Sequence, residues 1–362
     1  MNKELLDLYS DYLIVTDRYA TATGLSSILG GKISHDKITR FLDEEEYDSK
    51  TLWKIVKPKV KEIENSQGAI LFDDTLSEKP YTEENELINW HWDHSKGRSI
   101  KGINILNMLY CTEEVSIPIG YEAIRKEYQV EGTSDGKGKG KRKSEQTKNE
   151  LMRKLLQQAV TNGVDFKWVM ADIWYGSAEN LNFIKKECKG DFIVPLKKNR
   201  KVALSEAAKN RGQYVSIGSL KLEPGSRLRV YLNGIDFPVT LIKDVFINGD
   251  DSEAVQYLVC SDLTTTYQQI ITLYQRRWKV EEYHRSLKNN ATLSGSPTRT
   301  VRTQTNHIFA SIIAFFKLEV MKQKTRLNHY AMKSTIHLAA LQSALKKIEE
   351  LKLGTQLSLE FA

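Results

Sequence analysis

The chain has 362 residues, of which 40% are hydrophobic and 27% charged. This length allows two or three domains with sizeable cores, and this composition excludes a disordered or fibrous protein. The formal net charge of +7 favours a polyanionic partner. The three cysteines are far apart and form neither a disulfide framework nor a Cys-x2-Cys metal motif. The longest apolar run, residues 308–316, is too short to span a bilayer, so we expect a cytoplasmic protein with no membrane association.

The first 65 residues show the pattern of several short helices. A helix ends at the Gly30-Gly31 turn, and a second helix starts after Ser34, a suitable N-cap. This pattern is typical of a helix-turn-helix domain, in which the second helix contacts DNA. A plain helical hairpin is the alternative. The side chains of the second helix that would face DNA are His35, Lys37, Thr39 and Arg40.

Apolar runs predict buried strands from residue 68 onward. They include GAILFDDT, GINILNMLYC and SIPIGYEA, and the Glu113-Glu114 link between the last two predicts a hairpin. Further runs, FKWVMAD and DFIVPL, are preceded by segments that read as amphipathic helices. Strands and helices in this mixed order predict an α/β domain.

Residues 131–150 form a segment rich in glycine and lysine. The segment has almost nothing to bury, so we expect a flexible loop. Positive charge is all that a non-specific phosphate contact needs. The cations that would make such contacts include Lys141, Arg142 and Lys143, and a solvated loop without a ligand is the alternative.

The hydrophobic pattern changes twice in the rest of the chain. Short alternating runs at about 201–262, with Asn233-Gly234 and Asn248-Gly249, predict an antiparallel β segment. The last sixty residues read as helical. We therefore expect three parts, a helical domain at 1–65, an α/β domain at 66–325 and a helical segment at 326–362.

The segment from Leu273 to Asn290 reads as one helix with an unusual polar stripe. At roughly 100° per residue, four polar side chains share an arc of roughly 60° beside a buried apolar stripe. The ordinary explanation is a solvated face, on which ion pairs contribute only a few tenths of a kcal/mol. The four residues are Tyr274, Arg277, Glu281 and Lys288.

Three acidic positions have similar surroundings in the predicted fold. Asp74, with Asp73 beside it, ends one buried strand, Asp172 ends another, and Glu281 lies on the helix. Acids at strand ends can converge at one edge of a sheet. Carboxylates brought together need a positive charge, and such hard oxygen ligands suit Mg²⁺ or Mn²⁺. Adjacent strand residues face opposite ways, so only one of Asp73 and Asp74 can point into such a site.

The segments FDDTLS, VMADIWYGS and YQRRWKVEEYHRSLK resemble bacterial insertion-sequence transposases of the DDE class. The last segment fits the Tyr-x2-Arg-x3-Glu-x6-Lys signature of the cut-and-paste branch. The resemblance covers about residues 20–325. It implies a ribonuclease H-like core, a mixed sheet with flanking helices, carrying a β-rich insertion at about 201–262 and preceded by the N-terminal helical DNA-binding domain.

The resemblance also implies roles for individual residues. Asp74, Asp172 and Glu281 would hold two Mg²⁺ (or Mn²⁺) ions. Asp74 is preferred over Asp73 because it stands directly before Thr75, as in the Asp-Thr pair of the family. The residues that would grip the phosphates beside the cut are Tyr274, Arg277, Lys288 and, further along the same face, Arg285.

The activity implied is transposition of double-stranded DNA. Metal-dependent nicking at the transposon end would be followed by a hairpin intermediate and by strand transfer into target DNA, in a homodimer associated with the bacterial nucleoid. A catalytically silent DNA-binding regulator, or a metal-dependent nuclease of the same fold, are the alternatives. Trp174, close to Asp172, is a candidate to stack on a flipped base, although a core position is the stronger expectation.

The segment WHWDHSKGRSIKG also raises the question of a zinc site. His91 and His94 have no third ligand at suitable spacing, so zinc is disfavoured. We expect these histidines to flank the DNA path, together with Lys96, Arg98 and Lys101. Trp90 and Trp92 read as core or interface residues rather than as a platform for stacking bases.

Overall fold

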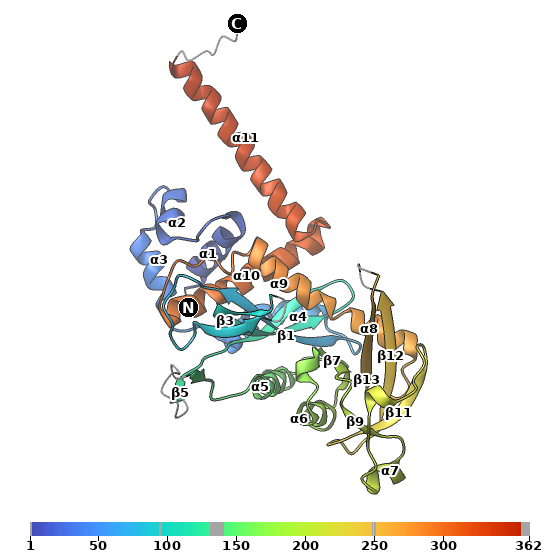
Figure 1. Cartoon of the computed structure of the whole chain (residues 1–362). Coiled ribbons are helices and arrows are strands. Elements are labelled where there is room, and N and C mark those ends of the chain that lie inside the picture. The colour runs from blue at the N-terminus through green and yellow to red at the C-terminus, as the bar shows by residue number, and fades with distance from the viewer. Residues whose placement is uncertain (1, 94–95, 131–140, 248, 250, 356–362) are drawn as a thin grey trace. The chain divides into compact units, whose positions relative to one another are not determined.

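The computed structural model describes all residues except 1, 94–95, 131–140, 248, 250 and 356–362 (Figure 1). The chain forms two compact units, one of residues 47–284 and one that joins residues 1–46 to residues 285–362. The functional boundaries expected near residues 65 and 325 remain predictions. No helix in the described part of the chain is long and apolar enough to cross a membrane.

The unit of residues 47–284 is built on a mixed sheet. In its centre the strands run in the order β4-β3-β1-β7-β8. β1 is antiparallel to β3 and parallel to β7, and β7 is parallel to β8. This is the ribonuclease H-like arrangement that the resemblance implied, and the apolar runs predicted these strands. The strands are β1 (Ala69–Glu78), β2 (Asn89–Asp93), β3 (Arg98–Cys111), β4 (Ser116–Ala123), β7 (Trp168–Ala171) and β8 (Asp191–Leu196).

The β-rich insertion continues the same sheet instead of forming a separate one. Its last strand, β13, pairs antiparallel with β8, and β12 and β11 follow outward. Gly234 has a φ of +90° in the turn between β11 and β12, as the Asn-Gly pair predicted. The elements are β9 (Lys201–Ala203), α7 (Glu206–Asn210), β10 (Val215–Ser216), β11 (Arg227–Leu232), β12 (Val239–Ile247) and β13 (Glu253–Cys260).

Helices lie on both sides of this sheet, with α5 and α6 opposite α9 (Figure 1). α5 begins with a capping box between Thr147 and Glu150, and it buries Leu155 and Leu156. α4 is tied to β4, because the Ser49 hydroxyl donates to the Tyr121 carbonyl at 2.6 Å. The helices are α4 (Ser49–Ile63), α5 (Lys148–Thr161), α6 (Ala178–Asn182), α8 (Tyr267–Gln275) and α9 (Trp278–Asn290).

The single helix predicted from Leu273 to Asn290 is wrong. The chain forms α8 and α9 with a break at Arg276 and Arg277. Through the break the backbone bonds run from residue i to residue i−3, as between Arg277 N–H and Tyr274 C=O at 2.9 Å. The segment holds neither glycine nor proline, so no residue type in it marks the break.

The other unit is helical. Gly30 and Gly31 have φ values of +60° and +76° in the turn before α3, and Ser34 caps α3 as predicted. α10 is largely buried, and the Tyr9 hydroxyl contacts Nδ1 of its His307 at 3.0 Å. The helices are α1 (Lys3–Val15), α2 (Ala22–Ile28), α3 (His35–Leu42), α10 (Val301–Thr325) and α11 (His329–Thr355).

The glycine- and lysine-rich segment is only partly a loop in the described residues. β6 (Lys141–Lys143) pairs with β5 (Tyr128–Val130), so the expectation of a loop is wrong for residues 141–143. Residues 131–140 of that expectation lie outside the described residues. Backbone pairing explains the difference, because a strand can form between polar residues when its hydrogen bonds are satisfied.

Candidate active site

Asp73 and Asp74 face opposite sides of the sheet. In the β1–β3 pair, Asp73 lies opposite Asn107 and Asp74 lies opposite Leu106. The Asn107 side chain contacts α9, through the Tyr283 hydroxyl at 3.1 Å and His284 Nε2 at 3.2 Å. Because directly paired residues share a face, Asp73 points to the side of α9 and Asp74 to the other side.

Asp73 meets two side chains of α9. Asp73, Glu281 and His284 each offer a ligand atom, and these atoms all lie within 4.8 Å of one another. Glu281 and His284 are three residues apart, so they lie on one face of the helix. Two carboxylates and an imidazole at this spacing are suited to hold a divalent cation.

Arg277 supplies the positive charge of this cluster. Its Nη1 lies 3.4 Å from a carboxylate oxygen of Asp73 and 3.4 Å from one of Glu281. The guanidinium also lies over the ring of Tyr274, 5.9 Å from its centroid. Three members of the predicted polar stripe therefore gather beside Asp73 despite the break between α8 and α9.

The pKa of Asp73 rises from its ordinary value to about 7. Burial is the largest cause, and the negative charges of Asp74 and Glu281 add to it, while Arg277 opposes it. A carboxyl group in this state gives up its proton readily when a cation binds. The surroundings of Asp73 are thus those of a metal ligand that lacks sufficient positive charge.

Asp172 follows the end of β7, next to Asp73 in the sheet. β7 pairs parallel with β1 up to Phe72 and Ala171, which precede these two acids. The negative charge of Asp172 helps to raise the pKa values of Tyr274 and Arg277, in each case behind other causes. Asp172 is therefore near the cluster, although the 4.8 Å group does not include it.

Asp74 has different partners. Its carboxylate accepts hydrogen bonds from Lys148 Nζ at 2.7 Å, the Tyr175 hydroxyl at 2.9 Å and Asn104 Nδ2 at 2.9 Å. Burial alone would raise its pKa, but these partners bring the pKa below its usual value. Protein groups therefore already neutralise the charge of Asp74.

His284 and Asn107 were not among the residues predicted for the site. The Glu-x-x-His spacing of Glu281 and His284 was a usable signal, since it places both side chains on one helix face. Asn107 carried no signal of its own, because its position opposite Asp73 depends on the register of β1 and β3.

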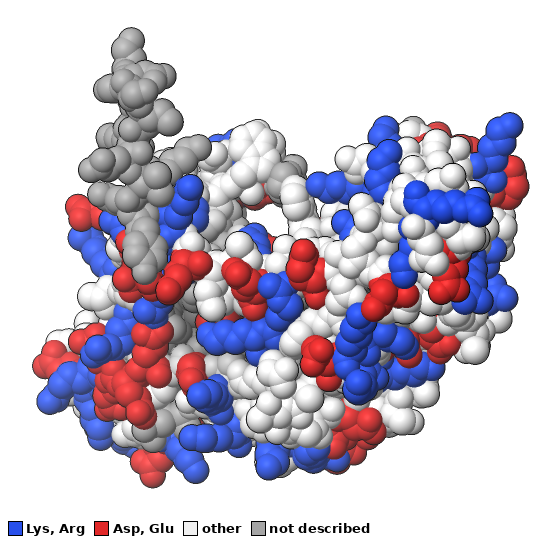
Figure 2. Space-filling model, turned by 90° about the horizontal axis from the view of Figure 1, so that it is seen from below, with Lys and Arg blue, Asp and Glu red and all other residues white. Residues whose placement is uncertain are grey.

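The remaining predicted residues are spread over the chain. Arg285 and Lys288 are exposed on the part of α9 that belongs to the helical unit. Lys37 and Arg40 are exposed on α3, whose Ile38 is buried. Arg142 is half-buried and Lys143 exposed on β6, and the side chain of Lys141 lies outside what the structure describes. On the face drawn in Figure 2, Lys and Arg side chains are interspersed with Asp and Glu and do not form a single patch.

Several aromatic expectations change. Trp174 lies on a short 3-10 turn after Asp172 and is 53% exposed, with Lys197 Nζ 4.2 Å from its ring centroid, so the core position expected for it is wrong. Trp90 and Trp92 are also exposed, because both point outward from an edge strand. His94 lies outside the described residues.

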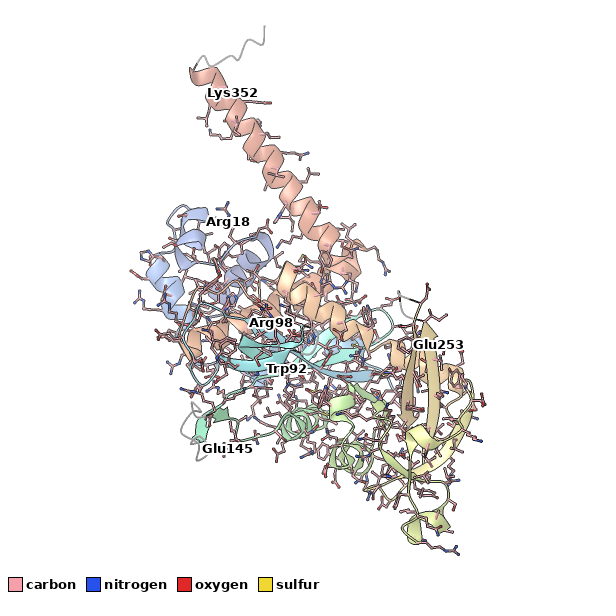
Figure 3. All side chains as sticks on the ribbon, in the orientation of Figure 1. Arg18, Trp92, Arg98, Glu145, Glu253 and Lys352 are labelled. Atoms are coloured by element: carbon pink, nitrogen blue, oxygen red, sulfur yellow. The ribbon has the colours of Figure 1, made fainter. Side chains whose placement is uncertain are left out.

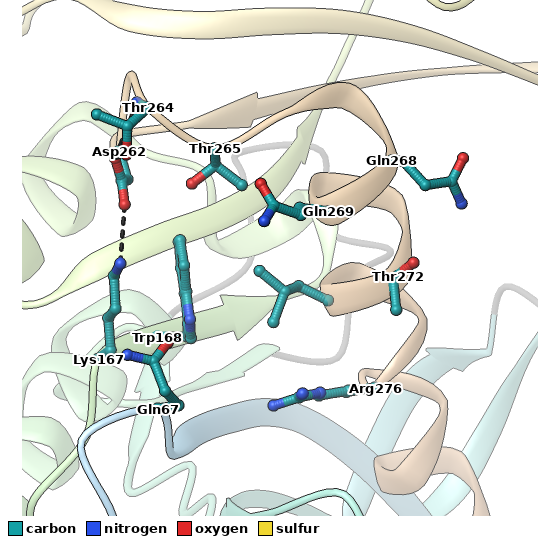
Figure 4. A pocket seen from close by; sticks show the side chains of 11 residues that line it. Gln67, Lys167, Trp168, Asp262, Thr264, Thr265, Gln268, Gln269, Thr272 and Arg276 are labelled. Atoms are coloured by element: carbon teal, nitrogen blue, oxygen red, sulfur yellow. Dashed lines mark hydrogen bonds and ion pairs between the residues drawn. The ribbon is translucent and has the colours of Figure 1, made fainter.

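A separate pocket of about 440 Å³ lies at the other end of β7 (Figure 4). Trp168, the first residue of β7, lines it, whereas Asp172 follows the last residue of that strand. Lys167 and Asp262 form an ion pair of 2.8 Å at its wall. The pocket is therefore distinct from the carboxylate cluster.

Comparisons with known proteins agree with this geometry. A family model described as DDE superfamily endonuclease matches residues 1–214, and one described as transposase DDE domain matches residues 137–316. No curated protein matches the chain. Among solved structures, Kluyveromyces polysporus Argonaute with a guide RNA matches at 13% identity and a TM-score of 0.21, covering 74% of this chain and 31% of that one. A similarity this low supports no argument about fold or function. By its two family matches, the chain belongs to the DDE superfamily of transposase endonucleases, enzymes that cleave nucleic acid with divalent metal ions.

Proposed function

We propose that this protein is a cut-and-paste DNA transposase of the branch with the Tyr-Arg-Glu-Lys signature. The observation that carries the proposal is the meeting of Asp73, Glu281 and His284 beside Arg277. These residues come from a strand and a helix that lie about 200 residues apart in the chain. The double-stranded ends of the mobile element and the target DNA are the substrates, in the bacterial cytoplasm at the nucleoid.

The metal ligands in this proposal are Asp73, Asp172 and Glu281, with His284 at the edge of the set. Asp73 replaces Asp74, because Asp73 faces Glu281 whereas Asp74 is held by Lys148. Carboxylates suit Mg²⁺ or Mn²⁺, and a set of three can hold two ions. When bound, such ions supply Lewis acidity that makes a water or hydroxyl more nucleophilic and stabilises the leaving oxygen.

Arg277 and Tyr274 hold the DNA at the cut. Arg277 is a fork of donors beside two carboxylates, so a phosphate that enters the site can exchange for part of those contacts. The Tyr274 ring lies against the guanidinium and limits its orientation. Lys288 and Arg285 continue the phosphate contacts along α9. Phosphate contacts of this kind position the substrate and do not read its sequence.

The chemistry is a series of substitutions at phosphorus. In the first, a water oxygen attacks the phosphorus at the transposon end, the bond to the 3′ oxygen breaks, and the 3′ oxygen leaves as a hydroxyl. That hydroxyl then attacks the opposite strand and displaces another 3′ oxygen, which closes a hairpin. A second water reopens the hairpin, and the freed 3′ hydroxyl attacks target DNA. Each step forms one phosphorus–oxygen bond and breaks one.

The helical unit supplies the contacts that recognise the element end. α3 exposes Lys37 and Arg40 on the face opposite its buried Ile38. A short helix preceded by a tight turn is suited to enter the major groove. Arg142 and Lys143 add non-specific phosphate contacts.

A homodimer is part of the proposal, and α11 supplies its surface. Leu338, Leu341, Leu345 and Ile348 are exposed at the alternating spacing of three and four residues found in coiled coils. All side chains from residue 338 to residue 352 are exposed. Because most helical stability in proteins comes from packing of an apolar face, a second copy of α11 is the occupant we propose for this exposed seam.

The test is cleavage of a labelled duplex carrying the end of the element, with Mn²⁺ or Mg²⁺. Glu281→Ala is expected to abolish nicks and hairpins while gel-shift binding of the duplex persists. Glu282→Ala is the matched control, because Glu282 is an exposed acid at the next position of α9. If the unmodified protein binds the duplex but does not cleave it, the result would support the alternative of a catalytically silent regulator. If the protein nicks the duplex but forms no hairpin or strand-transfer product, the result would support the alternative of a metal-dependent nuclease of the same fold.

A further inference from the structure

Two tryptophans stand exposed on β2, the strand at one end of the sheet order. Trp90 is 52% exposed and Trp92 58% exposed. Because they are two residues apart on a strand, both side chains project from the same face. Large exposed apolar side chains on an edge strand carry a risk of aggregation, so a pair of them marks a contact surface.

This face is the one that carries the carboxylate cluster. Trp90 pairs directly with Lys101 of β3, and Asp73 pairs directly with Asn107 of the same strand. Both pairings run without a register shift, and residues 101 and 107 differ by an even number, so they share a face. Six residues of strand separate them by roughly 20 Å.

Basic side chains surround the two indoles. Lys101 lies opposite Trp90 on the same face, whereas Arg98, which adjoins the Ser99 that pairs with Trp92, points to the other face of this edge (Figure 3). Lys126 Nζ donates to the Trp90 carbonyl at 2.6 Å. Two acids lie beside them as well: Glu84 accepts the Trp90 indole N–H and Asp93 accepts the Lys96 amide, neutral donors that leave both carboxylates charged. Counted over both faces of this edge, these three cations outnumber the two carboxylates, so the charge of the surface favours an anionic partner.

The contact with Glu84 also fixes how Trp90 is presented. The indole N–H donates to a Glu84 carboxylate oxygen at 2.7 Å, so the polar edge of the ring is engaged within the protein. What remains for a ligand is the apolar face of the ring. Flat apolar surfaces beside cations are what unpaired nucleobases require, because any base can stack on them while the cations contact its phosphates.

The spacing of the two side chains fits this ligand. Alternate residues on a strand are roughly 6.7 Å apart, about twice the 3.4 Å rise between successive bases of a strand. A single base has room to lie between two aromatic side chains at such a separation. A paired duplex keeps its bases stacked inside and offers only its backbone to this surface.

We infer that Trp90 and Trp92 form a binding platform for the bases of an unpaired DNA strand. The inference rests on the proposed function, because closing a hairpin at a transposon end requires base pairs beside the cut to open. The platform would hold that strand some 20 Å from the carboxylates, by the rise along β3. The platform would position the unpaired strand and would not contact the reacting atoms.

The experiment is a binding titration of the full chain with short single-stranded oligothymidylate, followed by fluorescence anisotropy in EDTA. Trp90→Ala and Trp92→Ala should each weaken binding by on the order of tenfold, the effect of losing one base stack. Trp90→Phe and Trp92→Phe should restore most of it. Phe246→Ala is the matched control, an exposed aromatic on β12 that should leave binding unchanged.

Duplex of the same length separates this inference from general DNA binding. If the alanine variants weaken duplex binding and single-strand binding equally, or weaken neither kind of binding, the inference of a base-stacking platform is wrong. A changed oligomeric state with unchanged DNA binding would instead make this face a protein contact, which also overturns the inference. Because EDTA removes the metal, none of these outcomes depends on cleavage, and a failure of the proposed catalytic function would be seen only with Glu281→Ala.

Discussion

At the scale of single residues, Asp73 and Asp74 illustrate how neighbours in a strand can serve opposite purposes. Asp73 is crowded by other carboxylates and lacks sufficient positive charge. Asp74 accepts three hydrogen bonds, one from an ammonium group. The first arrangement costs stability and suits the metal ligand that we propose, whereas the second contributes stability.

Asp73→Asn is expected to stabilise the metal-free protein. The raised pKa means that the folded state binds a proton more tightly than the unfolded chain between pH about 4 and about 7, so the wild type loses stability as the pH rises through that window. The variant escapes this loss and should gain on the order of 1–3 kcal/mol above pH about 7. Thermal unfolding in EDTA at several pH values measures it, and a gain that shrinks with rising pH would refute it.

Asp74→Asn is expected to destabilise the metal-free protein. Its lowered pKa contributes stability that is present above the ordinary value of a carboxyl group and is lost as the pH falls through the folded-state value. Because Lys148 is partly exposed, the loss at neutral pH should be modest, about 1 kcal/mol. The same unfolding series reports it, and no change in the melting temperature at neutral pH would show that the three bonds contribute nothing.

At the scale of elements, the predictable features were those encoded in local pattern. Apolar runs predicted the central strands, and Ser34 marked the start of a helix, since its side chain accepts the N-cap hydrogen bond. The break between α8 and α9 was not predictable, because no glycine or proline marks it. Alternation showed that only one of Asp73 and Asp74 enters the site, but which one depends on where α9 packs, a tertiary contact.

The exposed seam of α11 makes a prediction at this scale. Replacing Leu341 and Leu345 together by serine should remove the centre of the seam and shift the protein toward monomer. Substituting Ala339 and Ala340 by serine, on the same exposed stretch but off the seam, is the matched control. Analytical ultracentrifugation of the full chain decides the question. A wild type that is monomeric at all concentrations would remove α11 as a dimer surface.

At the scale of the whole molecule, the net charge of +7 and the exposed cations of α3 predict a strong dependence of DNA binding on salt. Lys37→Ala combined with Arg40→Ala should reduce the slope of log affinity against log salt by about 2, because each phosphate that is no longer neutralised lowers the slope by about one. Lys50→Ala, an exposed lysine of α4, should leave the slope unchanged. Equal slopes for the double variant and the wild type would exclude α3 from DNA binding.

The proposed cutting site uses Asp73 with Glu281, while Asp74 serves the fold. The most direct measurement is Mn²⁺-dependent cleavage of a labelled element end by the wild type, Asp73→Asn and Asp74→Asn, at a temperature at which circular dichroism shows all three folded. We predict that Asp73→Asn binds the duplex but makes no nick, and that Asp74→Asn still cuts. Cleavage by Asp73→Asn together with an inactive Asp74→Asn would contradict this assignment and return the metal site to Asp74.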